Sequence, residues 1–139
     1  MATFNKFNSF VEALAEKVHN LGSDTLKVML TNTAPSAANT VKADITEISA
    51  GNGYTAGGTA ATISSSAQTS GTYKLVLADV VFTATGGSIG PFRYAVLYND
   101  TAASDELIAY FDYGSSLTLA TGETFTVDFD GSAGVLTLA

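Results

Sequence analysis

The chain has 139 residues, a length that suits one compact domain with a hydrophobic core of its own. It contains no cysteine and a single histidine, which excludes disulfides and thiol chemistry and leaves almost nothing for imidazole catalysis or a zinc centre. Only 14% of the residues are charged, the net charge is −7 and 46% are hydrophobic, a composition typical of a strand-rich domain with many turns.

The negative charge is concentrated towards the C-terminal end of the sequence. Residues 1–99 hold six acidic and six basic residues, whereas residues 100–139 hold seven acidic residues and no basic one. Such a segment repels phosphate, and the scattered bases form no cluster, so binding to nucleic acid is disfavoured. The acidic segment is either a solvated surface that keeps the protein soluble or a face that docks on a basic partner.

No targeting or membrane segment is predicted. The opening residues, MATFNKF, lack the apolar region of a secretory signal. The longest apolar runs are far shorter than the ~18 residues that a membrane helix needs. We therefore expect a protein that is synthesised in the cytoplasm, stays soluble and does not bind membranes.

One helix is predicted near the N-terminus, over about residues 9–19. Ser9 and Glu12 have the spacing of a capping box, in which each side chain satisfies a free backbone amide. The apolar residues Phe10 and Leu14 then recur on one helical face. Gly22 supplies a natural C-terminal stop.

The segment after this helix predicts one strand followed by less regular structure. Residues 26–30 (LKVML) form the expected strand, and the ambiguous residues 41–48 are interpreted as one or two helical turns. Residues 51–58 contain four glycines and are expected to form a loop. The Thr- and Ser-rich residues 59–70 fit either an edge strand or a mobile loop.

From residue 72 onwards the sequence predicts a succession of short strands. They are residues 73–82 with a bulge near Asp79, 92–98, 107–113, 117–119 after a turn at 114–116, 123–129 and 135–138. Many short strands without a second long helix predict a mainly β fold, an antiparallel, jelly-roll-like β-sandwich with one short N-terminal helix. Residues 1–139 are expected to form a single domain, with residues 1–22 as its N-terminal arm and helix.

Residues 86–90 match G-x-S-x-G, the nucleophile elbow of α/β-hydrolases. That elbow needs a helix after its serine and a histidine further downstream. Here Pro91 and a predicted strand follow Ser88, and the single histidine, His19, lies upstream. A glycine-rich hairpin is therefore expected in place of a catalytic site. His19 itself is expected to contact the carbonyl groups at the helix end or solvent.

Four residues are candidates for contact with a partner. Phe4 and Phe7 precede the helix in an otherwise polar segment, where they either fold back on the core or present an apolar arm. Asp128 and Asp130 alternate along a predicted strand and so point to the same side. They resemble part of a calcium loop, but other required ligand positions are threonines, so strand-end carboxylates are preferred to a loose calcium site at a subunit contact. No metal or cofactor is predicted.

Several strings of the sequence resemble small structural proteins of tailed bacteriophages. The similarity covers most of the chain and lies in DITEI and GNGYTAGG at residues 44–48 and 51–58, GPFRYAVLYNDT at 90–101, LIAYFDYG at 107–114, FTVDF at 125–129, FNSFV at 7–11 and LKVMLTN at 26–32. These strings are structural and contain no catalytic signature.

The resemblance implies a non-enzymatic virion structural protein. The chain is similar to capsid decoration (cement) proteins. This similarity implies a jelly-roll-like sandwich on the capsid surface that binds the major capsid protein. It also implies self-association, as a homodimer or homotrimer. Because similar strings occur in tail components, a tail, baseplate or adhesin-like host-binding component is the alternative. The resemblance implies no catalytic or cofactor-binding residue.

Overall fold

The structure is a computed structural model that describes residues 2–139. In chain order its elements are β1 (Asn5–Lys6), α1 (Ser9–Ala15), β2 (Leu26–Thr31), a 3₁₀ turn η1 (Lys42–Asp44), β3 (Thr59–Ala61), β4 (Ile63–Thr69), β5 (Thr72–Leu77), β6 (Val80–Thr83), β7 (Ile89–Asn99), β8 (Leu107–Leu119), β9 (Thr124–Val127) and β10 (Leu136–Leu138).

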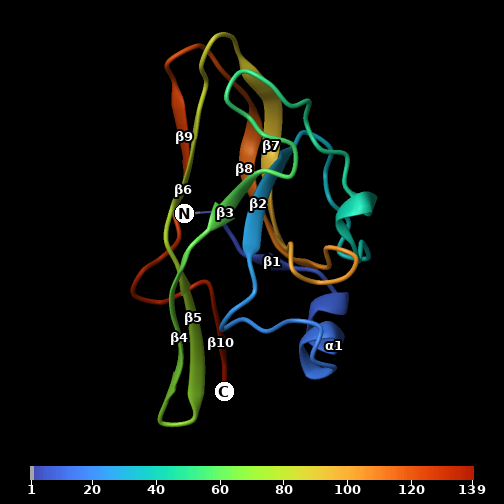
Figure 1. Cartoon of the computed structure of the whole chain (residues 1–139), viewed down its shortest axis with the longest axis vertical. Coiled ribbons are helices and arrows are strands. Elements are labelled where there is room, and N and C mark those ends of the chain that lie inside the picture. Colours follow the sequence, from blue (N-terminus) through green and yellow to red (C-terminus); the bar gives the residue numbers. More distant parts are fainter. Residues whose placement is uncertain (1) are drawn as a thin grey trace.

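The strands form two layers. One layer is a five-stranded sheet in the order β1-β8-β7-β2-β3, and the other consists of a two-stranded sheet, β6-β9, above a three-stranded sheet, β10-β5-β4 (Figure 1). All strand pairs are antiparallel. This arrangement confirms the predicted mainly β, antiparallel sandwich with one short N-terminal helix. Among residues 2–139, no helix is long and apolar enough to cross a membrane.

The loop and turn predictions for residues 41–70 agree with the structure in part. Residues 41–48 contain one 3₁₀ turn, and residues 51–58 form the expected loop, which ends at Gly58 next to β3. Residues 59–70 are extended rather than a mobile loop, and they divide between the two layers. β3 is an edge strand of the five-stranded sheet, while β4 is an edge strand of the three-stranded sheet.

The predicted long strand over residues 73–82 is broken at Ala78 and Asp79. Before the break β5 pairs with β10, and after it β6 pairs with β9. The Asp79 carboxylate accepts a hydrogen bond from the backbone N–H of Phe129 at 2.9 Å, where the partner strand also leaves the ladder. Residues 128–134 connect β9 to β10 and run outwards next to the break between β5 and β6 (Figure 1). We call them the 128–134 loop.

The turn predicted at residues 114–116 is instead a bulge within one continuous strand. Tyr94 of β7 lies opposite Asp112 of β8, and Phe92 lies opposite Leu117. Residues 113–116 of β8 therefore lie opposite the single residue Arg93. The extra length makes β8 curve away from its neighbour, as bulged strands do.

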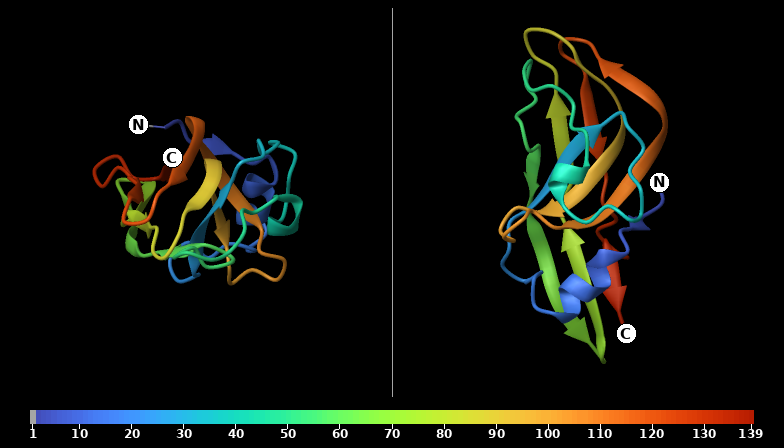
Figure 2. Two further views of the ribbon diagram at one scale, coloured as in Figure 1. Left: turned by 90° about the horizontal axis from the view of Figure 1, so that it is seen from above. Right: turned by 90° about the vertical axis from the view of Figure 1, so that its right-hand side faces the viewer.

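The five-stranded sheet is covered by apolar side chains on both faces. The larger core lies between the two layers, and a smaller cluster lies on the opposite face of the sheet, made of Phe7, Met29, Val96, Tyr98 and Leu107. Residues 32–50 cross this second face, and Ile45 from that segment packs against the cluster (Figure 2). Phe7 is 0% exposed, so it folds back on the core and presents no surface to a partner.

Helix α1 is shorter than predicted and ends differently. The N-cap is Asn8, with no side-chain hydrogen bond, so the capping box predicted at Ser9 is wrong. At the other end Lys17 N–H bonds Leu14 O at 3.3 Å and Val18 N–H bonds Ala13 O at 2.8 Å. This is the Schellman pattern, with Lys17 at a φ of 68°. Lys17, and not Gly22, therefore ends the helix.

Lys17→Gly is expected to stabilise the protein by about 1 kcal/mol, because glycine adopts positive φ without the steric cost that a side chain incurs. Urea unfolding curves of the variant and the parent protein measure the change. Lys17→Ala is the control and is expected to change stability little, since it keeps a Cβ at the same backbone angle. A glycine variant less stable than the alanine variant would contradict the assigned helix end.

Candidate binding groove

A groove of about 540 Å³ lies where β8 of the large sheet approaches β9 of the opposite layer, next to the 128–134 loop. We call it the β8–β9 groove. Its walls come from β7, β8, β9, the 128–134 loop and the first residues of the N-terminal arm, as which we denote residues 2–7. Five aromatic side chains line it: Phe4, Phe111, Tyr113, Phe125 and Phe129.

The aromatic rings of the groove pack against one another edge to face. Phe111 contacts Phe4 and Phe129, with ring centroids 5.9 Å apart in each pair, and Tyr113 contacts Phe125 at 5.6 Å. This geometry brings the positive edge of one ring to the negative face of the next and is favourable for aromatic pairs. Tyr113 remains 54% exposed, so the groove presents an aromatic surface to solvent.

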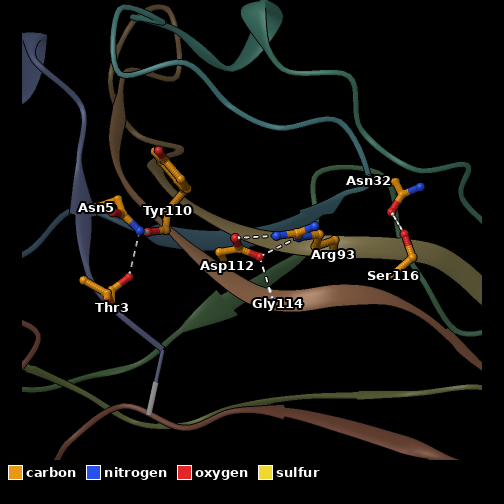
Figure 3. A network of polar contacts seen from close by, with 8 residues as sticks. All are labelled: Thr3, Asn5, Asn32, Arg93, Tyr110, Asp112, Gly114 and Ser116. Carbon is orange, nitrogen blue, oxygen red and sulfur yellow. Dashed lines mark hydrogen bonds and ion pairs between the residues drawn. The ribbon is translucent and has the colours of Figure 1, made fainter.

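An ion pair lies along the β7–β8 wall. Arg93 Nε and Nη2 donate hydrogen bonds to the two carboxylate oxygens of Asp112 at 2.8 and 2.9 Å, and Gly114 N–H donates to the same carboxylate at 2.8 Å (Figure 3). The Arg93 guanidinium, followed by the Gly114 amide, holds the pKa of Asp112 below its usual value. The charge of Arg93 is thus engaged within the protein.

The N-terminal arm is attached beside this wall. Asn5 Nδ2 donates hydrogen bonds to Thr3 O at 2.9 Å and to Tyr110 O at 3.3 Å (Figure 3). These bonds and the β1–β8 pairing place Phe4, which is half-buried, over the Phe111 end of the groove.

Asp128 and Asp130 do not alternate along a strand, because β9 ends at Val127 and both lie in the 128–134 loop. Asp130 Oδ1 accepts hydrogen bonds from the backbone N–H groups of Ala133 at 2.8 Å and Ser132 at 2.7 Å, which lower its pKa. Asp128 is exposed. Both residues line the groove, together with Phe4, so three of the four predicted interface residues converge there. Over residues 2–139, no three acidic, histidine or cysteine side chains gather in a way that could hold a metal ion.

The acidic C-terminal segment does not form one face. Asp100 lies in the β7–β8 connection and pairs with Lys27 at 3.0 Å, whereas Glu123 lies in the β8–β9 connection and accepts a hydrogen bond from Ala120 N–H at 2.7 Å. Asp130 belongs to a third connection, the 128–134 loop. The segment is therefore divided among separate places in the fold, and Asp128 and Asp130 are its contribution to the groove.

Ser88 is exposed and lies in the connection between β6 and β7, which is not a hairpin. It precedes β7, which is a strand where a nucleophile elbow needs a helix. β6 pairs with β9 and β7 pairs with β8, so the glycine-rich segment links two sheets. The Ser88 carbonyl accepts a hydrogen bond from Asn52 Nδ2 at 3.0 Å.

His19 is buried, contrary to the expected contact with helix carbonyls or solvent. Asn99 Oδ1 accepts the backbone N–H groups of Thr101 and Ala102, which turns the Asn99 amide nitrogen towards Asp24 at 2.7 Å and His19 Nδ1 at 3.0 Å. His19 Nδ1 must therefore accept, and the neutral ring carries its proton on Nε2. Among the described residues Nε2 has no hydrogen-bond partner.

The stability of the protein is expected to decrease on mild acidification. Burial lowers the pKa of His19 below 6.5, against the smaller opposing effects of Glu106 and Asp24. A lowered pKa means that the folded state favours the neutral ring. The stability that depends on a neutral His19 is therefore fully present above pH 6.5, and it is lost as the pH falls through the pKa of the folded state.

The free energy of unfolding in urea, measured between about pH 7.5 and 5.5, tests this expectation. The parent protein should lose stability across this interval, and His19→Gln, which retains a hydrogen-bond acceptor for Asn99 but does not titrate, should lose less. Parallel pH profiles for the two proteins would contradict the assigned role of His19.

The sequence contains a pattern that indicates the two aromatic walls of the groove. Aromatic residues recur at even spacings in both bordering segments: Phe111 and Tyr113 are two residues apart, and Phe125 and Phe129 are four apart with Val127 between them. Each series places its rings on one face of an extended segment. That the two series face each other depends on the tertiary fold.

No protein-family model, no curated protein and no solved structure matches this chain.

Proposed function

We propose that this protein is a non-enzymatic structural component of a tailed-bacteriophage virion, a capsid decoration protein that binds the major capsid protein on the surface of the mature head. The observation that supports this proposal is the β8–β9 groove, which offers another polypeptide an aromatic surface with carboxylates at its rim. The strings that resemble phage virion proteins include the segments that build the groove, residues 107–114 and 125–129.

A sandwich that binds only the assembled shell would stabilise that shell through its binding free energy. At a free concentration of 100 times the dissociation constant, each bound copy adds about 2.7 kcal/mol. A copy, or a homodimer or homotrimer, that contacts two capsid subunits at once gains further through effective concentration. This role requires a rigid scaffold with a docking surface and no catalytic group.

The proposal is tested with undecorated mature heads of the parent phage and the labelled protein. We expect saturable binding that approaches the copy number of the major capsid protein, and heads that resist heat better once decorated. Protein that remains unbound would refute the head assignment. A few copies per particle, by quantitative gel staining of virions, would favour the tail, baseplate or host-binding alternative that the resemblance also implies.

A further inference from the structure

The β8–β9 groove is bordered by strand edges that lack partners. Within the described part of the chain, residues 2–139, the outer side of β8 pairs with β1 only at Tyr110 and Ala109, and β9 pairs with β6 alone. Among residues 2–139, the β8 edge from Phe111 onwards therefore has no neighbouring strand, and this part of β8 follows the outline of the molecule in the right-hand view of Figure 2. Such an edge presents unpaired N–H and C=O groups that can pair with another chain.

The N-terminal arm shows how a strand adds to this edge. Asn5 lies opposite Tyr110 and Lys6 opposite Ala109 in antiparallel pairing, and the Phe4 ring contacts Phe111. The ladder stops at Asn5, although β8 continues to Leu119. A further extended segment at this edge would thus continue a pairing that the chain has already begun.

The charge of the groove favours a basic occupant. Among the described residues 2–139, Arg93 is the one basic residue in its lining and is engaged with Asp112, whereas Asp128 is exposed and has no ion pair there. Lys74 lies close enough to Asp130 to offset part of its charge. The exposed ring of Tyr113 can also attract a lysine or arginine through its π face. A second copy of this chain is a poor match, since it carries a net charge of −7 and no basic cluster.

We propose that the β8–β9 groove binds an extended segment of a partner protein in which apolar side chains alternate with lysine or arginine. The segment pairs with the open edge of β8, places its apolar side chains on the aromatic rings and directs its basic side chains towards Asp128. This inference rests on the proposed function in one respect only, that the partner carrying the segment is the capsid protein.

The first experiment uses a peptide and the full-length protein labelled with ¹⁵N. The peptide is acetylated and amidated, has seven residues and alternates valine or phenylalanine with lysine; its analogue has glutamate in place of each lysine. We expect the lysine peptide to shift backbone amide signals of residues 111–117 and 124–130, and the glutamate peptide to leave them unchanged. No shift, equal shifts with both peptides, or shifts confined to other regions would overturn the proposal.

Three variants then quantify the groove. Tyr113→Ala removes an exposed anchor and is expected to weaken binding of the lysine peptide about tenfold. Asp128→Lys is expected to weaken it about fivefold. Glu16→Lys changes the net charge equally but lies at the end of α1, away from the groove, and should stay within about twofold. Equal affinities for all three variants would refute the site.

The same variants on undecorated heads separate this inference from the proposed function. If the parent protein decorates heads and Tyr113→Ala and Asp128→Lys do so equally well, the groove is wrong as the docking site while the function stands. If the lysine peptide binds the groove but the parent protein ignores heads, the function fails and the site stands. Self-association of the parent protein that Tyr113→Ala abolishes would identify a second copy as the occupant and overturn the inference.

Discussion

Phe7→Ala is expected to lower the free energy of unfolding by about 4 kcal/mol, in the range for deletion of a buried aromatic side chain. Phe7 is 0% exposed and belongs to the smaller cluster with Met29 and Val96, on the face of the five-stranded sheet opposite the main core. Its ring lies 5.3 Å from that of Tyr110. Because this cluster is small, few neighbours are available to fill the space that the ring would leave.

The matched variant is Phe4→Ala, three residues earlier in the same arm. Phe4 is half-buried and lines the β8–β9 groove, so its removal should cost about 1 kcal/mol in stability. Urea unfolding at constant pH gives both values. Similar losses for the two variants would contradict the different burial assigned to them, and a stable Phe7→Ala protein would show that the second cluster contributes little.

Gly58→Ala is expected to destabilise the protein by about 2–5 kcal/mol, which combines the cost of positive φ with that of overpacking. Gly58 lies directly before β3 with a φ of 79°. A Cβ at this position would collide with the carbonyl oxygen of Val28 and lie 2.6 Å from its carbonyl carbon. Val28 belongs to β2, between β7 and β3, so the backbone cannot yield without disturbing the sheet.

Gly71→Ala separates the two costs. Gly71, in the turn between β4 and β5, has a φ of 84°, but a Cβ there would have no heavy atom within 4 Å. We expect this variant to lose only the conformational part, about 1–2 kcal/mol. Thermal or urea unfolding of the two variants provides the comparison, and equal losses would show that the close approach of Gly58 to β2 has no energetic consequence.

Features set by local sequence were predicted well. β2 was predicted closely because an apolar run of β-formers lies between turn residues, and the loop at 51–58 because its glycines disfavour regular structure. The break at Asp79 could not be predicted. It depends on where the partner strand leaves the ladder at Phe129, and no property of residues 73–82 alone encodes that position. The bulge at residues 113–116 likewise follows from the register with β7.

The environment of His19 shows why the polar sites were harder to predict than the strands. Its partner Asn99 is 80 residues away in the sequence, and Asn99 is oriented by the turn that it begins, through the backbone N–H groups of Thr101 and Ala102. The groove is an intermediate case. The fold brings the interface candidates Phe4, Asp128 and Asp130 together in one groove, but the strand expected to carry the two aspartates ends at Val127.

The order of strands in the five-stranded sheet has a consequence for synthesis of the protein on the ribosome. β2 pairs with β7, with Val28 opposite Leu97, and β1 pairs with β8, with Asn5 opposite Tyr110. In both pairs the second strand is synthesised long after the first. A nascent chain therefore cannot assemble this sheet until most of its length has been translated. Until β7 has been made, the apolar residues of β2 lack their neighbours on that strand, and a transcript truncated before β8 would yield a product exposed to proteases and chaperones.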